Sequence, residues 1–500
     1  MPPLPSDVTH AAPAAADHGA PPVVIVGAGV SGLTCALAVA RAGRRVLVLE
    51  REPEVGGRVR SRLVDGYVVD RGFQVLFTAY PTLARALGLG DAAGAPGDGA
   101  RRLALRRFAP AARLVTRRGA SLVGDALRDP RLFAPTVLAG ALSPADKLRL
   151  LMLRRLAMSL SVDDCFAPAY DAVPAREFLR ARGVSARAVS RFFAPFYGGI
   201  LLDPALGTSA AVLLFTFKML SEGDTAVPAA GMGDVARRLA EQLPAGTVRT
   251  GVAVEAVLAE GGRAAGVRTR DGLVIVADDV VLATEAPAAR HLAGTAGAAL
   301  TAPDDALGCT TVWFAAGGAT PPLPGRAIWL NAAGHEEAAL VPTPTPGGGP
   351  AVSHAVTMTE VAPEYAAADA RHGRHLVAAT AVGPAAALGD GELVPRMRAE
   401  LAAMRHAAGL DDGPALIPVA VERVPYAQFA QPPGARARRT PASAGLPGLW
   451  RASETAHSSS LEGAARGGAL AAEALFAQPA PAGGHAEAGH AAGPRARPVH

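Results

Sequence analysis

The pattern of hydrophobic positions changes abruptly at Pro22. Residues 23–26 are four apolar side chains in a row (VVIV), which is typical of a strand buried on both faces. A helical pattern follows to about Ala42, and Gly43 is a typical C-terminal stop. Residues 45–49 (RVLVL) form a second short apolar run. This order predicts a strand–helix–strand unit of an α/β fold.

The turn between the first strand and the helix, residues 27–32 (GAGVSG), has the spacing GxGxxG. Gly27 permits a tight turn, Gly29 lets a pyrophosphate approach the backbone, and Gly32 lets the helix pack closely on the strand. The helix N-terminus offers free N–H groups and partial positive charge to phosphates. Glu50, at the end of the second strand, is placed to bind ribose hydroxyls and disfavours NADP. The expected nucleotide contacts in this unit are Gly27, Ala28, Gly29, Val30, Ser31, Gly32 and Glu50.

Further segments alternate between helical and strand-like patterns. The Leu-heavy KLRLLMLRRLAMSL, from Lys147, predicts a helix. Strand-like patterns cover residues 251–257, 280–283, 313–318 (WFAAGG) and 326–334 (RAIWLNAAG). The Pro- and Gly-rich residues 341–350 are expected to form a surface loop.

Composition narrows the function classes. Half of the 500 residues are apolar but only 5% are aromatic, so a large core must be built from Ala, Val and Leu. The formal net charge is +5, and the densest basic run covers residues 101–119. That run lacks interleaved aromatic residues and a recognition-helix context, so nucleic acid is not an expected partner. It is expected to form strands or loops with solvated arginines, with peripheral membrane contact as the alternative.

Three cysteines, Cys35, Cys165 and Cys309, fit a reducing compartment without a disulfide framework, and Cys35 is expected to be a small core residue. No CxxC pair occurs, and no metal site is expected. No run reaches the roughly 18 apolar residues of a membrane span, and the first 22 residues do not resemble a signal peptide. A cytoplasmic protein is expected, with peripheral contact at the inner membrane face as the alternative.

A second motif directly follows Glu50. Residues 51–58 read REPEVGGR, and here the chain resembles the superfamily of flavin-containing amine oxidases, protoporphyrinogen oxidases and phytoene desaturases. In that superfamily a GGR loop lies along the FAD pyrophosphate, and residues like 65–81 (DGYVVDRGFQVLFTAYP) pass under the isoalloxazine. The resemblance therefore implies FAD and adds Arg51, Gly56, Gly57, Arg58, Gly72, Phe73 and Gln74 to the expected cofactor contacts.

The resemblance extends to three distant segments. It implies that Val254 contacts the adenine through its backbone and that residues 280–287 return the chain to the cofactor domain. Residues 448–476 resemble the C-terminal FAD motif, in which Glu454 points to the ribityl–pyrophosphate region. A helix starting at Leu461 and Glu462 then points its N-terminus at the flavin N1–C2=O edge. No cysteine follows Cys309, so non-covalent FAD is expected at this motif, and Ser453 stands where the family has Gly, which predicts weakened binding.

The implied architecture is a discontinuous, GR2-type, Rossmann-like FAD-binding domain with an inserted α+β substrate-binding domain. The FAD domain is expected at residues 22–80, 225–290 and 440–476, and the substrate domain at residues 81–224 and 291–439. Residues 1–21 and 477–500 are expected to be a disordered lead and tail.

The expected chemistry is hydride transfer from substrate to flavin N5, with oxygen or a quinone as electron acceptor. Among side chains, His457, Tyr426 and Lys218 are weak catalytic candidates. A helix-cap role for His457 and a helix-surface position for Lys218 are the simpler interpretations. Ser460 stands where amine oxidases of the superfamily carry a cage aromatic, and Tyr426 and Phe429 supply aromatic surface on one side only.

The missing cage favours a small hydrophobic substrate of the polyene or porphyrinogen kind. Amine oxidation is the first alternative. A redox-neutral flavin isomerase or a cofactor-free binding protein of the same fold is the second.

Overall fold

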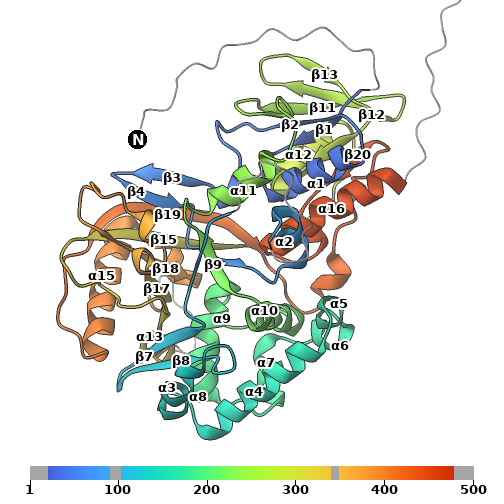
Figure 1. Cartoon of the computed structure of the whole chain (residues 1–500). Helices are drawn as coiled ribbons and strands as arrows, with labels where there is room; N and C mark the ends of the chain where they lie inside the picture. Colours follow the sequence, from blue (N-terminus) through green and yellow to red (C-terminus); the bar gives the residue numbers. More distant parts are fainter. Residues whose placement is uncertain (1–20, 90–102, 304, 339–347, 478–500) are drawn as a thin grey trace, which may run out of the picture.

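A five-stranded parallel sheet gathers strands from distant parts of the chain in the order β10-β2-β1-β14-β20 (Figure 1). The computed structural model describes residues 21–89, 103–303, 305–338 and 348–477. The strands are β1 Val23–Val26, β2 Val46–Leu49, β10 Val248–Arg249, β14 Val280–Leu282 and β20 Leu449–Arg451. Helix α1, Val30–Arg41, follows β1 directly, so the predicted strand–helix–strand unit and the α/β class are confirmed.

The central strand β1 is buried on both faces because its side chains alternate between two cores. Val23 and Ile25 pack with α1 and the C-terminal helix α16, Leu461–Ala477. Val24 and Val26 pack with helix α12, Ala286–Thr295, and with a three-stranded meander. The meander consists of β11 Val254–Glu260, β12 Arg263–Thr269 and β13 Val274–Val276. Cys35 on α1 is fully buried, as predicted.

A seven-stranded mixed sheet forms the second layer, in the order β19-β15-β18-β17-β16-β7-β8. All neighbouring strands are antiparallel except β7 and β16. Both predicted insertions contribute to it: β7 Ala111–Thr116 and β8 Gly119–Gly124, then β15 Ala306–Ala316, β16 Ile328–Asn331, β17 His354–Thr357, β18 His375–Val382 and β19 Ile417–Phe429. Helix α15, Asp390–Ala407, covers one face with Leu393, Met397 and Leu401.

Helices dominate the rest of the first insertion. The main ones are α3 Phe133–Leu138, α4 Pro144–Ser159, α7 Ala175–Ala181, α9 Ala194–Ile200 and α10 Ala210–Glu222. The helix predicted from Lys147 is confirmed as α4. Helix α10 is buried along most of its length and packs against α4.

The shorter elements connect these layers. They are η1 Gly57–Val59, β3 Ser61–Val64, β4 Tyr67–Asp70, β5 Leu76–Phe77, α2 Pro81–Leu87, β6 Leu105–Arg107, η2 Pro130–Leu132, α5 Val162–Cys165, α6 Pro168–Asp171, α8 Ala186–Ala188, η3 Val189–Phe193, β9 Thr225–Pro228, α11 Gly233–Ala240, α13 Ala332–Ala338, α14 Met358–Val361, η4 Pro363–Tyr365, η5 Gly383–Ala387, η6 Ala435–Arg438 and η7 Glu454–Ala456.

Several sequence predictions need correction. The basic run does form strands, but its arginines are not simply solvated: the Arg113 guanidinium lies over the Trp329 ring at 4.9 Å, and Arg107 pairs with Asp224. The strand expected from residue 251 begins at Val254, and the boundary expected at residue 290 falls inside α12. The domain limits stay predictions. Residues 1–20 of the predicted lead (1–21), residues 478–500 of the predicted tail (477–500) and most of the 341–350 loop lie outside the described residues, and Ala477, expected in the tail, is the last residue of the C-terminal helix α16.

Candidate functional site

A cavity of about 590 Å³ lies between the two layers. At one end it is lined by the residues that follow the carboxyl ends of β1, β2, β14 and β20, among them Gly27, Glu50, Thr284 and Ser453. Ligands of open parallel α/β sheets bind in this crevice. At the other end the lining comes from α9, α10 and the seven-stranded sheet. The cavity therefore joins the predicted nucleotide site to the inserted elements.

Bare backbone forms the floor of the nucleotide end. Gly29 is the N-cap of α1, has no side-chain cap, and has open space where a Cβ would stand. A Cβ on Gly27, whose φ is +108°, would lie 2.7 Å from the Ala283 carbonyl oxygen. A Cβ on Gly32 would lie 2.0 Å from the Gly27 oxygen. Only glycine fits at positions 27 and 32. The lack of a side chain at Gly29 leaves the N-terminus of α1 open to a phosphate.

The GGR loop lies against this turn. The Gly56 N–H donates to the Ala28 carbonyl at 2.9 Å, and Gly57 packs on the Gly29 Cα. Gly56, Gly57 and Arg58 all line the cavity, as does Arg51. The structure thus brings together the two glycine motifs that the sequence predicts to contact the pyrophosphate.

Glu50 lines the cavity with its carboxylate held by backbone groups. Its Oε2 accepts from the Ala28 N–H at 2.8 Å and its Oε1 from the Glu52 N–H at 3.0 Å. Each carboxylate oxygen keeps a further lone pair for a ligand hydroxyl. Thr284, which lies against Gly27 and lines the same cavity, has a buried Oγ1 with no hydrogen-bond partner within the described residues. An orphaned hydroxyl and a fixed acid beside a bare glycine floor fit a dinucleotide such as FAD.

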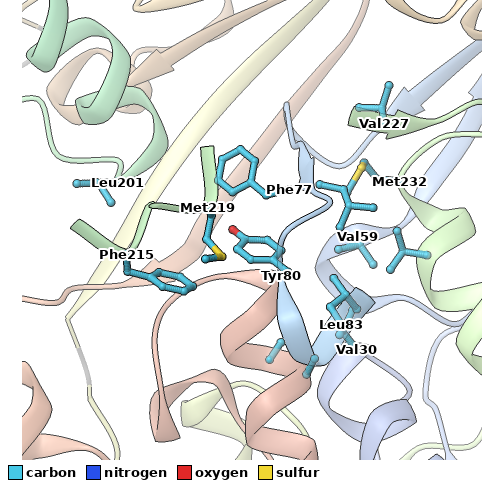
Figure 2. Close-up of a cluster of buried hydrophobic side chains, with 14 of the residues drawn as sticks. Val30, Val59, Phe77, Tyr80, Leu83, Leu201, Phe215, Met219, Val227 and Met232 are labelled. Atoms are coloured by element: carbon cyan, nitrogen blue, oxygen red, sulfur yellow. The ribbon is translucent and has the colours of Figure 1, made fainter. Parts of the chain in front are cut away.

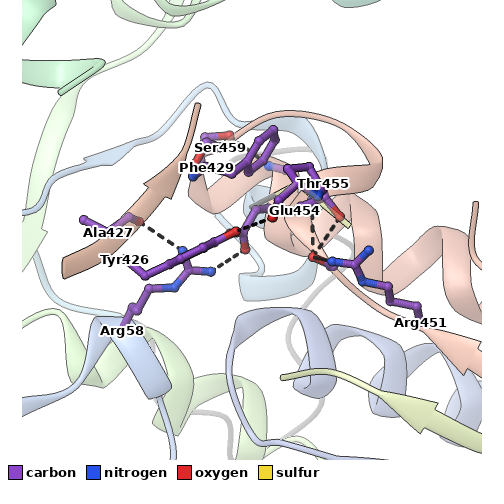
Figure 3. A network of polar contacts seen from close by, with 12 residues as sticks. Arg58, Tyr426, Ala427, Phe429, Arg451, Glu454, Thr455 and Ser459 are labelled. Atoms are coloured by element: carbon purple, nitrogen blue, oxygen red, sulfur yellow. Dashed lines mark hydrogen bonds and ion pairs between the residues drawn. The ribbon is translucent and has the colours of Figure 1, made fainter. Parts of the chain in front are cut away.

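Arg58 and Glu454 form an ion pair that links the GGR loop to the C-terminal segment (Figure 3). Arg58 Nη1 also donates to the Ala427 carbonyl on β19 at 3.0 Å. Burial lowers the pKa of Arg58, but the Glu454 carboxylate outweighs it, so the net shift of that pKa is upward. Three distant segments are therefore joined at one wall of the cavity.

Ser453 directs its hydroxyl into its own segment. The Oγ accepts from the Thr455 N–H at 3.3 Å and lies 3.1 Å from the Thr455 Oγ1 and 3.5 Å from Arg451 Nη2. The side chain caps η7 in this way. Ser453 also lines the cavity, and its effect on cofactor affinity stays a prediction.

Most of the other expected cofactor residues also line the cavity, namely Val30, Ser31, Gly72, Phe73, Gln74, Val254 and Leu461. Ala28, Gly32 and Glu462 do not. The Glu462 carboxylate is buried and accepts from the N–H groups of Thr82 and Leu83, so it caps α2. It serves the packing of α16 on α2 rather than the cavity.

None of the three weak catalytic candidates is among the residues that line the cavity. His457 lies beside Phe166, with 5.0 Å between ring centroids, and its Nδ1 is 2.9 Å from the Ser458 Oγ. Burial, with nearby arginines, lowers its pKa to about 3, so it is neutral. The half-buried Tyr426 directs its hydroxyl toward the Pro303 carbonyl, at 3.5 Å.

The predicted helix-surface position of Lys218 is wrong. The residue is not on a helix surface but buried in α10, where it forms an ion pair with Glu222. Because the Lys218 side chain is buried between α4 and the cavity, its ammonium group requires such a partner.

The inserted end of the cavity is apolar. Phe196 and Ile200 come from α9, Val212, Phe215 and Leu220 from α10, and Ile328 and Leu330 from β16. Within the cavity lining, Phe215 also stacks on Tyr80, with 6.1 Å between ring centroids, and Tyr80 packs on Phe77 at 5.2 Å (Figure 2). Through Tyr80, these ring contacts connect α10 to Phe77 on β5.

Sequence reasoning missed His354 on β17. It lines the cavity, its ring centroid is 5.2 Å from that of Phe73, and burial lowers its pKa to about 4. A Cβ on Gly199 would lie 2.8 Å from its Nδ1, so Gly199 leaves room for the imidazole. The signal was a histidine in the mostly apolar segment 351–357 (AVSHAVT), but nothing local indicates which face it takes.

Curated relatives match parts of the chain. A phytoene dehydrogenase of Streptomyces griseus is 46% identical over 92 residues, which is 18% of this chain and 17% of that protein. A coproporphyrinogen III oxidase of Propionibacterium freudenreichii is 34% identical over 185 residues, 36% of this chain and 31% of that protein. The matches to these relatives span less than a third of their length.

Solved structures share the fold over nearly the whole chain. A putrescine oxidase bound to putrescine aligns with a TM-score of 0.60 at 18% identity, covering 92% of this chain and 99% of that one. A putative protoporphyrinogen oxidase from Exiguobacterium aligns with a TM-score of 0.61 at 18% identity, covering 91% and 99%. The family described as flavin containing amine oxidoreductase matches residues 30–476. The resemblance of the sequence motifs is thereby confirmed, and the chain belongs to the flavin-containing amine oxidoreductase family, whose members are flavin-dependent oxidoreductases.

Proposed function

We propose that the protein binds FAD non-covalently along the cavity and oxidises a small hydrophobic substrate of the polyene or porphyrinogen kind. The glycine floor, the anchored Glu50 carboxylate and the orphaned Thr284 hydroxyl support a dinucleotide rather than a mononucleotide, because they extend from the ends of β1, β2 and β14. The lack of any cysteine after Cys309 supports non-covalent binding at the C-terminal motif.

One observation supports the proposed substrate class. Among the described residues that line the cavity from α9, α10, β16, β17 and β18, none carries a formal charge. The one titratable group there, His354, stays neutral above about pH 5 because burial lowers its pKa to about 4. A cationic amine would lose its hydration without gaining an ionic partner, whereas an apolar substrate gains about 25 cal/mol per Å² that it buries.

A bound flavin supplies the hydride acceptor. The residues of this chain bind the flavin and orient the substrate beside it. Gly27 and Gly29 admit the phosphates, and Glu50 holds ribose hydroxyls. Phe196 and Phe215 exclude water from the substrate. The neutral His354 imidazole offers one N–H donor and one acceptor to a polar substituent of the substrate, and Gln428, whose Nε2 donates to the Ile200 carbonyl at 2.7 Å, limits the pocket on the β19 side.

We propose a cytoplasmic location and oxygen or a quinone as electron acceptor. The three cysteines are free and buried, which is compatible with a reducing compartment. Within the described residues, no helix has both the length and the apolar content to cross a bilayer.

The test is anaerobic reduction of the bound flavin, followed as loss of its visible absorbance. Polyenes and porphyrinogens should bleach the flavin, and simple amines should not. Acid precipitation should release the yellow chromophore into the supernatant. Bleaching by amines alone would replace this proposal with amine oxidation, and a flavin that no substrate bleaches would favour a redox-neutral reaction.

A pair of matched variants places the reaction in the cavity. Leu220→Asp adds a charge to the apolar wall, and Leu273→Asp adds the same charge to the exposed turn that joins β12 and β13. The first should slow bleaching about tenfold or more, and the second should leave the rate unchanged. Equal rates in the two variants would place the substrate elsewhere.

A further inference from the structure

Large apolar side chains are exposed together at one end of the molecule. Phe133 and Leu138 on α3 are 64% and 80% exposed, and Met152 on α4 is 63% exposed. The set, called here the α3–α4 face, is Leu127, Phe133, Val137, Leu138, Leu148, Leu151, Met152 and Met158. These are eight of the fourteen large apolar side chains that are exposed in the described part of the chain. Exposed apolar patches of this kind mark interaction sites.

The face is a consequence of how α4 packs. Asp146, Leu153 and Ala157 form the buried row of α4, and α10 lies against the helix. Leu148, Leu151 and Met152 lie on the opposite row, so α4 is apolar on both sides rather than amphipathic in the usual sense. Lys147 Nζ donates to the Val137 carbonyl at 2.6 Å and ties α3 to α4. Both helices lie at the end of the molecule away from the parallel sheet (Figure 1).

The surroundings of this face are positively charged. Residues 127–160 contain six Arg or Lys and two Asp, a formal charge of +4. The two acids are not free: Asp146 is buried and bonded to Ser143 and Ser185, and Asp129 pairs with Arg131. Two partners from outside the segment, Asp125 and Asp224, pair with Arg154 and Arg128 and reduce the charge to +2.

Arg155, one of the six cations already counted, is exposed within the outer row of α4. Two further exposed arginines, Arg182 and Arg187, lie on the adjoining turn, which is held to α4 through Ser185 and Asp146. A cationic rim around apolar side chains on helices too short to span is the composition of a segment that lies in the plane of a membrane surface.

We propose that the α3–α4 face docks the protein on an anionic membrane surface, with Phe133, Leu138 and Leu151 inserted among the lipids. A second copy of the chain fits this face less well, because a symmetric pair would oppose two positive surfaces. Helix α10 lies between α4 and the apolar end of the cavity, so a docked protein holds its substrate pocket one helix from the lipid. Docking itself does not depend on the proposed function.

The experiment is sedimentation of the full-length holoprotein with vesicles of phosphatidylcholine, with and without phosphatidylglycerol. The wild type should bind the anionic vesicles, and added salt should weaken binding because it screens the arginines. The double substitution Leu138→Asp and Leu151→Asp should weaken binding at least about tenfold, since it removes apolar insertion and adds two repelled charges. Both side chains are exposed, so the fold should tolerate the change.

The matched control is Leu273→Asp with Val276→Asp, which adds the same charges to another exposed apolar site, on the meander. It should bind about half as strongly as the wild type or better. Leu138→Trp gives a second measurement: its fluorescence should shift to the blue with anionic vesicles. Failure of the wild type to bind, or equal loss in both double variants, overturns the proposal. If the wild type is a dimer in solution and the double substitution Leu138→Asp and Leu151→Asp dissociates it, the face belongs to a second copy of the chain instead. Flavin bleaching by substrate in solution tests the proposed function separately.

Discussion

Replacement of Gly467 by Ala tests how closely α16 must approach the cofactor segment. A Cβ on Gly467 would lie 2.0 Å from the Ser453 carbonyl oxygen and 2.5 Å from its carbon, both backbone atoms. The shortest tolerated approach is about 3.0 Å, so α16 and residue 453 must separate by about 1 Å. Overpacking of this kind costs about 1–3 kcal/mol, and the higher helix propensity of Ala returns about 1 kcal/mol. We expect a net loss of about 1–2 kcal/mol in the free energy of unfolding.

The movement also displaces Glu454, which follows Ser453 and pairs with Arg58 at the cavity wall. Urea unfolding followed by circular dichroism should therefore show a lower midpoint, and flavin fluorescence should report cofactor release at lower urea. The control is Gly391→Ala on α15, where a Cβ meets nothing within 4 Å. That variant should be as stable as the wild type or up to about 1 kcal/mol more stable. A Gly467→Ala protein with unchanged midpoint and flavin content would refute the close approach.

Three further predictions concern the site and the core. Glu50→Gln should weaken FAD binding about tenfold in a fluorescence titration of the apoprotein, because a charge-assisted acceptor of about 1.5 kcal/mol is lost; an unchanged Kd would contradict this role. Glu454→Gln should lower unfolding stability by about 1–2 kcal/mol and release flavin earlier on heating, since Arg58 loses its ionic partner, and a coincident melt would count against it. The pKa of His354 is lowered to about 4, so its imidazole is neutral in the folded protein above about pH 4. In the unfolded chain the same imidazole binds a proton below about pH 6.5. Stability is therefore lost as pH falls from about 6.5 to about 4, by about 3 kcal/mol from this group, and His354→Gln should show a correspondingly shallower decline than the wild type in urea titrations.

The nucleotide end of the cavity was predictable because its signals are local. The run of residues 23–26, the glycine turn and Glu50 are consecutive in sequence, and each follows from the conformation that its own segment must adopt. The C-terminal strand could be placed only by resemblance, since its partner β14 lies far away in the chain. The same resemblance placed Glu462 at the flavin, whereas its carboxylate caps α2 through Thr82 and Leu83.

The substrate end was not predictable from local pattern. His354 faces the cavity only because β17 pairs between β16 and β18, and a one-residue change of register would turn it to the opposite face. Lys218 is similar: a lysine in a helical pattern indicates a surface position, but packing of α10 between α4 and the cavity buries it beside Glu222. Tertiary neighbours, not propensity, decide both cases.

The order of strands in the parallel sheet has a consequence for biosynthesis. The ribosome synthesises β1, the glycine turn and β2 first. Strand β20, which pairs with the outer edge of β14, is made only after both insertions, and so is Glu454, which pairs with Arg58. The nascent chain must therefore hold unpaired apolar strand edges for most of translation, a state that attracts chaperones and favours aggregation. The cavity wall that Arg58 and Glu454 form is therefore completed only when the C-terminal segment has been made.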